Sequence, residues 1–155
     1  MKPARSNRHT LPQAALLKQH ISLAKKQIQL YQSCCQKLGM AYPDYTVLNM
    51  LSYHPKGSRP TDIASALAIQ PQTLTRILAA MRELGYIDRQ TQENDHRSAV
   101  ITITEAGAAT IKPLQTALQA IEEKALASFS IDEMTKLSEI SSRLLEELSA
   151  EFKKN

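Results

Sequence analysis

Two groups of side chains stand out in the sequence because they are rich in hydrogen-bond donors. The side chains that form them are Gln72, Thr73, Thr75 and Arg76 in the first group and Asp95, His96 and Arg97 in the second. Glutamine and arginine carry hydrogen-bonding atoms in a planar fork, so they suit flat partners that offer two bonds side by side. The chemistry that both groups predict is recognition through paired hydrogen bonds.

The first group falls at the start of a predicted helix. Pro71 suits the first position of a helix and Gly85 suits the residue that follows one. Between them, apolar residues at helical spacing form an inner face: Leu74, Ile77, Leu78, Met81 and Leu84. The polar residues of the first group lie outside that face. A shorter helix beginning at Pro60 or Thr61 precedes the turn at residues 68–70. A short helix, a tight turn and a longer helix form the helix-turn-helix, whose second helix enters the DNA major groove.

Base recognition follows from the residue types at the start of that helix. Glutamine can bond adenine and arginine can bond guanine through two hydrogen bonds each, which indicates base contacts for Gln72 and Arg76. Thr73 and Thr75 suit base contact, but phosphate contact and helix capping fit them equally.

The second group lies at the tip of a predicted hairpin. Residues 85–91 and 99–103 have the β-branched, alternating pattern of short strands, and Asp95, His96 and Arg97 form a charged loop tip between them. A guanidinium on a thin loop suits the narrow, electronegative minor groove, which points to Arg97. Asp95 either orients Arg97 or forms the turn.

The spacing Asp-x-Arg-x5-(Leu/Ile)-Thr-x-x-Gly over residues 95–107 resembles the wing signature of the MarR family of bacterial transcriptional regulators. The motifs Ile63-Ala64, Thr73-Leu74-Thr75-Arg76 and Leu84-Gly85-Tyr86-Ile87-Asp88-Arg89 support the resemblance. It covers residues 11–152 and implies a homodimer, intertwined through the first and last two helices, on a pseudo-palindromic site in double-stranded DNA. It also implies a small, often phenolic effector in a crevice between the dimer helices and the winged domain.

The charge pattern departs from that of many relatives. His96 stands where many carry a second arginine, which adds a possible pH dependence, and Gln70 replaces the usual small N-cap residue. Acids and bases balance over residues 70–97, whereas residues 1–43 carry seven bases and no acid. Two alternatives to a ligand-tuned regulator therefore remain: a winged helix that binds proteins without reading DNA, and a cysteine-based redox sensor.

The ends of the chain have the apolar stripes of long helices. One seam runs from Leu17 to Leu38, and a capping box at Ser130 opens a final helix; a third long helix begins at Thr104 or Glu105, with Pro113 as its kink or its true start. Residues 121–155 are acidic. Three explanations of this charge pattern stay open: the basic arm contacts DNA phosphate, basic and acidic helices pair in a dimer, or the charges only form solvated faces.

The predicted fold is mainly α with a small β-wing, a winged helix-turn-helix flanked by dimerisation helices. Residues 1–10 form a flexible basic arm, 11–42 and 105–152 a helical dimerisation module, and 43–104 the winged domain.

Effector and redox residues are less specific. Polar-edged side chains suited to line the crevice are Tyr31, Tyr42, Tyr45 and His54, although tyrosines at helical spacing also suit a half-buried core. Cys34 is the candidate redox residue, whereas Cys35 lies on the apolar seam and suits burial.

Several function classes find no support in the sequence. It has no phosphate-binding glycine loop, no nucleophile elbow, no paired acidic motif and no metal-ligand spacing, so we expect neither an enzyme nor a cofactor or metal. No apolar run approaches the roughly 20 residues of a membrane span, and no signal-peptide pattern opens the chain. We therefore expect a cytoplasmic protein without a membrane partner.

Overall fold

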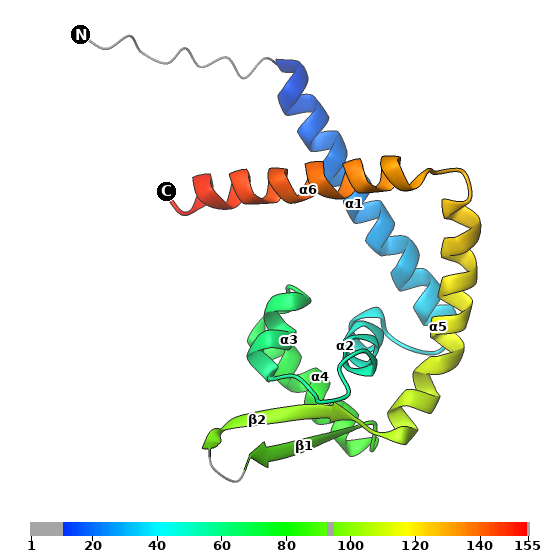
Figure 1. Ribbon diagram of the computed structural model, residues 1–155, viewed down its shortest axis with the longest axis vertical. Helices are drawn as coiled ribbons and strands as arrows, with labels where there is room; N and C mark the ends of the chain where they lie inside the picture. The colour runs from blue at the N-terminus through cyan, green and yellow to red at the C-terminus, as the bar shows by residue number, and fades with distance from the viewer. Residues whose placement is uncertain (1–10, 93–94, 155) are drawn as a thin grey trace. The chain divides into compact units, whose positions relative to one another are not determined.

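The computed structural model describes residues 11–92 and 95–154, and it describes the side chains of residues 12–90 and 99–154. Within these ranges the chain forms six helices and one two-stranded sheet, which confirms the predicted fold class (Figure 1). Internal contacts divide the chain into two compact units, one ending at Gln115 and the other beginning at Thr116. None of the described helices has the length and hydropathy needed to cross a bilayer.

The elements follow one another with short connections. In chain order they are α1 (Leu11–Lys37), α2 (Tyr42–Ser52), α3 (Pro60–Ala66), α4 (Pro71–Glu83), β1 (Ile87–Gln92), β2 (Asp95–Ile103), α5 (Glu105–Leu126) and α6 (Ile131–Phe152). A proline lies in the first turn of α2, α3 and α4, and those of α3 and α4 stand where the sequence predicted. Gly85 follows α4 with a φ of +72°, the left-handed conformation that ends many helices.

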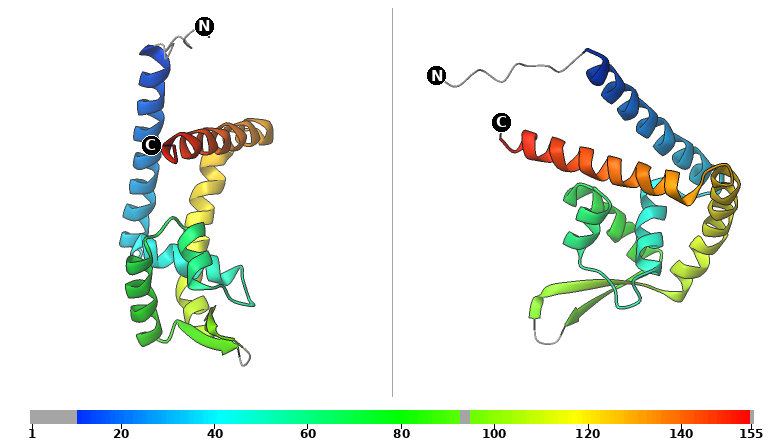
Figure 2. Two further views of the ribbon diagram at one scale, coloured as in Figure 1. Left: turned by 90° about the vertical axis from the view of Figure 1, so that its left-hand side faces the viewer. Right: turned by 45° about the horizontal axis from the view of Figure 1, so that its top comes forward.

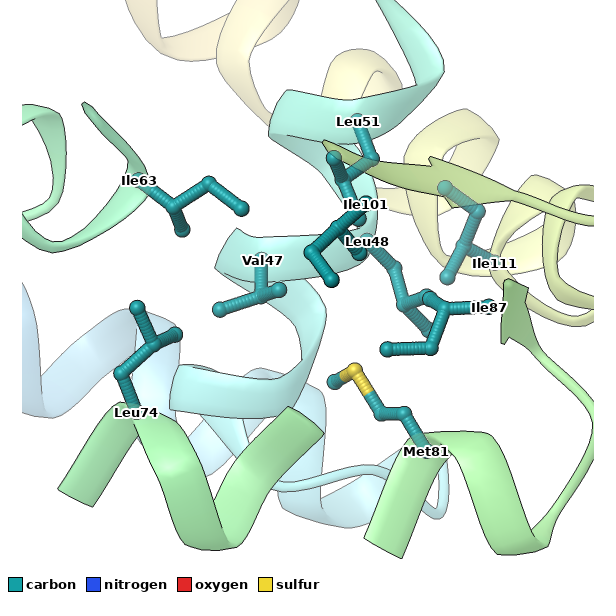
Figure 3. Packing of buried hydrophobic residues seen from close by; sticks show 9 residues of the cluster. All are labelled: Val47, Leu48, Leu51, Ile63, Leu74, Met81, Ile87, Ile101 and Ile111. Carbon is teal, nitrogen blue, oxygen red and sulfur yellow. The ribbon is translucent and has the colours of Figure 1, made fainter. Parts of the chain in front are cut away.

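The core of the first unit is built around α2. Val47, Leu48 and Leu51 of α2 are fully buried. Around them lie side chains from α3, α4, both strands and the start of α5: Ile63, Leu74, Met81, Ile87, Ile101 and Ile111 (Figure 3). Burying this apolar cluster fixes α3, α4 and the strands on one central helix.

Leu84 differs from its predicted place on the inner face of α4. Its side chain is 63% exposed, because α4 ends at Glu83 and Leu84 is the C-cap residue. The chain turns at Gly85 and Tyr86, so β1 begins at Ile87, two residues later than predicted. The helical period therefore stops one residue before the last apolar position that the sequence pattern included.

The strands form an antiparallel ribbon that projects from the helices in both views of Figure 2. Ile87 pairs with Ile103, and the register shifts between Thr91 and Gln92. Gln92 then pairs with Asp95, so β2 begins at Asp95. The prediction of a loop tip at residues 95–97 is wrong for the backbone, because strand pairing resumes beyond the irregularity. Their side chains lie outside the described residues.

The second unit contains the end of α5 and all of α6. Ser130 caps α6 in the predicted capping box: its hydroxyl accepts from the Glu133 N–H at 3.2 Å, and its own N–H donates to the Glu133 carboxylate at 2.8 Å. The bond from the Ser130 N–H, followed by a hydrogen bond of 2.8 Å from the Ser130 hydroxyl to the same carboxylate, holds the pKa of Glu133 below its usual value. None of the 22 residues of α6, all of them described, is buried in the single chain.

Candidate nucleic-acid interface

The exposed face of α4 carries the side chains that the sequence assigned to base reading. Gln72 and Arg76 lie one helical turn apart and are exposed. Ala79 and Glu83 continue the same face toward the end of the helix. The opposite face is anchored by Leu74 and Met81, each only 2% exposed. The recognition residues therefore project from a helix whose other side is held in the core.

The two threonines of α4 are exposed but differ in their contacts. The Thr75 hydroxyl donates to the Pro71 carbonyl at 2.9 Å, which leaves its oxygen free only as an acceptor in that geometry. Thr73 is exposed on the first turn. The N-cap residue Gln70 makes no side-chain capping bond, so the start of α4 depends on Pro71 and on its packing.

The two arginines at the start of α3 and on α4, Arg59 and Arg76, differ in whether an acidic side chain pairs with them. Among the described side chains, Arg76 has no ion-pair partner. By contrast, Arg59 before α3 donates to Asp62 at 2.9 Å, and this hydrogen bond raises the pKa of the guanidinium. A free guanidinium keeps all its donors available for a partner, so Arg76 is suited to bind an outside acceptor.

The wing signature joins the end of α4 to the start of α5. The Thr104 hydroxyl donates to the Gly85 carbonyl at 2.7 Å and accepts from the Gly107 N–H at 3.0 Å. The Thr104 N–H donates to the Tyr86 carbonyl at 3.0 Å. Thr104 thus caps α5, which explains why that helix begins at Glu105. The helix continues through Pro113, so the alternative that Pro113 marks its start is wrong.

Gly107 completes this connection by being small. A Cβ at this position would lie 2.2 Å from the Tyr86 carbonyl oxygen. The first turn of α5 can therefore approach the Gly85–Tyr86 backbone only if residue 107 has no side chain. Because Tyr86 directly precedes β1, the Thr-x-x-Gly part of the signature fixes the base of the ribbon relative to the recognition helix.

The structure brings two of the four predicted effector residues, Tyr31 and Tyr42, into ring contact. The rings of Tyr31 on α1 and Tyr42 on α2 have centroids 6.0 Å apart at an interplanar angle of 36°. The Tyr45 hydroxyl instead donates to the Asn49 amide oxygen at 3.4 Å, and both residues are on α2. His54 is exposed after α2, with its Nδ1 2.7 Å from the Met50 carbonyl.

A polar cluster that sequence reasoning missed connects α2 to α5. The Gln115 side-chain amide donates to the Asn49 amide oxygen at 2.9 Å and to the Ser52 hydroxyl at 3.0 Å. Ser52 in turn donates to the Asn49 carbonyl at 2.7 Å. The local signal in the sequence is weak: Asn49 and Ser52 are two polar residues three apart among the apolar residues of the second half of α2. These bonds hold the first half of α5 against α2.

The cysteines differ in burial. Cys35 is completely buried, as its place on the apolar seam predicted, and Cys34 is half-buried. Burial, followed by the neighbouring Cys34, raises the pKa of the Cys35 thiol. A protonated thiol is a poor nucleophile, so the geometry favours a structural role for Cys35.

Comparison with known proteins finds a family model and a relative that each resemble part of the chain. The model of the MarR family matches residues 38–98, which include α2, α3, α4 and β1. The organic hydroperoxide resistance transcriptional regulator of Bacillus subtilis is 32% identical over 85 residues, which cover 55% of this chain and 57% of that relative. The match therefore spans little more than half of either protein.

Solved structures match over most of the chain. A MarR family regulator from Neisseria meningitidis has a TM-score of 0.81 at 21% identity, covering 90% of this chain and 98% of that one. A mutant MarR from E. coli in complex with operator DNA has a TM-score of 0.69 at 20% identity, covering 87% of this chain and 94% of that one. At these identities the likeness shows a shared fold.

Proposed function

We propose that this chain is a regulator of the MarR family that binds a pseudo-palindromic site in double-stranded DNA as a homodimer, because residues 38–98 match that family. The observation that carries the proposal is the exposed face of α4, where Gln72 and the unpaired Arg76 project from a helix anchored in the core. The E. coli relative is complexed with operator DNA in its crystal structure, which supports the same kind of partner here.

In this proposal α4 enters the major groove and the ribbon follows the adjacent minor groove. Gln72 and Arg76 read base edges, with Thr73 and Thr75 at bases or phosphates. Arg97 enters the minor groove, Asp95 orients it and His96 adds a contact that depends on pH. The connection through Thr104 and Gly107 supports this assignment, because it holds the base of the ribbon at a fixed distance from α4.

The homodimer is supported by apolar side chains that the single chain leaves exposed. Large apolar residues more than half exposed on α1 and α6 are Leu16, Leu23, Leu30, Ile131, Leu137, Ile140, Leu145 and Phe152. Apolar surface on this scale is costly in water unless another molecule covers it. Residues 11–42 and 105–152 are therefore proposed as the dimerisation module, and 43–104 as the winged domain. Two copies related by a two-fold axis would read two half-sites.

Regulation by a small ligand and repression are finer parts of the proposal. The tilted contact between Tyr31 and Tyr42 joins α1 to α2, so an aromatic ligand that inserts beside it would shift one helix against the other. Tyr45 on α2 and His54 just after that helix serve as polar partners in this proposal. Bound on an operator that overlaps a promoter, the dimer would block polymerase and act as a repressor.

A redox-sensing regulator is a second candidate because the matched relative from Bacillus subtilis is named for organic hydroperoxide resistance. In this chain the candidate is the half-buried Cys34.

Fluorescence anisotropy with a labelled duplex from upstream of the gene tests the proposal. We expect saturable binding that weakens as salt rises and that exceeds binding to a scrambled duplex of the same composition. Equal binding to both duplexes at every salt concentration would contradict sequence-specific recognition. Binding to neither duplex would favour the protein-binding winged helix.

A further inference from the structure

A hollow of about 350 Å³ lies between the exposed side of α4 and the base of the ribbon, and it is lined by Thr75 but not by Gln72, Thr73 or Arg76. Thr75 and Arg82 of α4 line one side of it and Arg89 of β1 lines the other. Ile87 and Ile101, both buried, form its floor. The hollow is therefore an apolar-floored groove with a guanidinium on each side.

Both arginines are placed to reach the same outside molecule. Arg82 follows Thr75 by seven residues, or two helical turns, so the two lie on one side of α4. Arg89 is opposite Ile101 in the ribbon and follows the buried Ile87 by two residues, so both side chains lie on the ribbon face that packs toward the helices. Both arginines are exposed, and neither has an ion-pair partner among the described residues.

The geometry of double-stranded DNA indicates which part of the duplex would lie in this hollow. A helix in the major groove and a ribbon in the adjacent minor groove lie on either side of one sugar–phosphate strand, because that strand separates the two grooves. The hollow lies between these two elements. We propose that Arg82 and Arg89 bind a phosphodiester of that strand, an inference that rests on the proposed DNA-binding function.

The nearby acids leave the site positive. Asp88 also lines the hollow, but it pairs with Thr102 and alternates to the ribbon face opposite Arg89. Glu83 is adjacent to Arg82 in sequence and points about 100° away around the helix. Two guanidiniums therefore face the groove, and arginine forks match the geometry of phosphate oxygens. This clamp concentrates positive charge at one place in residues 70–97, whose acids and bases balance as a whole.

The test measures how the binding constant depends on salt for wild type, Arg82→Gln, Arg89→Gln and the double variant. Each lost phosphate contact lowers the slope of log K against log salt by about 0.9, so a dimer loses about 1.8 for each substitution. We expect base preference to stay unchanged, and Arg89→Lys to keep most of the wild-type slope. Arg143→Gln on α6 is the matched control, since it is exposed and removes the same charge.

A neutral methylphosphonate placed at single positions of the duplex locates the contact. We expect one phosphate per half-site where this change weakens wild-type binding but not binding of the double variant. A double variant with the wild-type slope, or one that loses base preference, would overturn the clamp even if wild type binds specifically. Absence of specific binding by wild type would overturn the proposed function, and the clamp with it.

Discussion

Replacing Gly107 with alanine opposes two effects of known size. Alanine is favoured over glycine in a helix by about 1 kcal/mol, so propensity alone predicts a more stable protein. However, the new Cβ would lie 2.2 Å from the Tyr86 oxygen and 2.9 Å from its carbonyl carbon. Carbon–oxygen contacts are normally about 3.3–3.6 Å, so α5 or the Gly85–Tyr86 backbone must move by about 1 Å. Hydrogen bonds from Thr104 to both carbonyls resist that movement.

Overpacking of this kind costs about 1–3 kcal/mol, and a backbone neighbour puts the cost near the upper end. We therefore expect a net loss of about 2 kcal/mol, which lowers the melting temperature by about 4–8 °C in a chain of this length. Thermal unfolding followed by circular dichroism at fixed protomer concentration measures it. Ala108→Gly in the same turn is the control, with a loss of about 1 kcal/mol from propensity alone. A raised melting temperature for Gly107→Ala would refute the close-approach argument.

Three other predictions concern DNA, the dimer and the thiols. In anisotropy titrations, Arg76→Ala should weaken specific DNA binding by about 1–3 kcal/mol for each subunit and relax one base position in each half-site. Arg97→Ala should weaken binding by about as much. Unchanged affinity for both variants would remove α4 and the wing from the interface. Light scattering should give twice the 17.3 kDa chain mass at micromolar concentration. Leu137→Glu should shift the measured mass toward that of the monomer. A stable wild-type monomer would contradict the two-half-site arrangement. Because burial raises the pKa of Cys35, a thiol reagent at neutral pH should label Cys34 first. Cys34→Ser should retain DNA binding with and without mild peroxide. If peroxide releases the wild-type protein from DNA but not Cys34→Ser, the chain is a redox switch.

Local signals in the sequence were enough to predict most element boundaries. Prolines in the first turns of α3 and α4 and the left-handed Gly85 act within a few residues of where they stand. The capping box at Ser130 is equally local. By contrast, the start of β2 depends on pairing with Gln92 across the ribbon, so the sequence pattern misplaced Asp95 in a loop.

The candidate site also depends on contacts between residues far apart in the sequence, which local patterns do not predict. Helical spacing alone predicts that Gln72 and Arg76 share an exposed face. No spacing predicts that Arg82 and Arg89 line one hollow, because they belong to a helix and a strand that only the fold brings together. The resemblance included Thr104 and Gly107 in a motif, but their physical role depends on the backbone of Gly85 and Tyr86, about 20 residues earlier.

Selection of duplexes from a random pool by the purified dimer tests the central claim most directly. We predict recovered sequences that share a pseudo-palindrome whose half-sites are separated by about one helical turn, roughly 10 base pairs, or a multiple of it. The same selection with Arg76→Ala should relax one position in each half-site and leave the spacing unchanged. Recovery of unrelated sequences by the wild-type protein, or the same consensus from Arg76→Ala, would contradict base reading by α4.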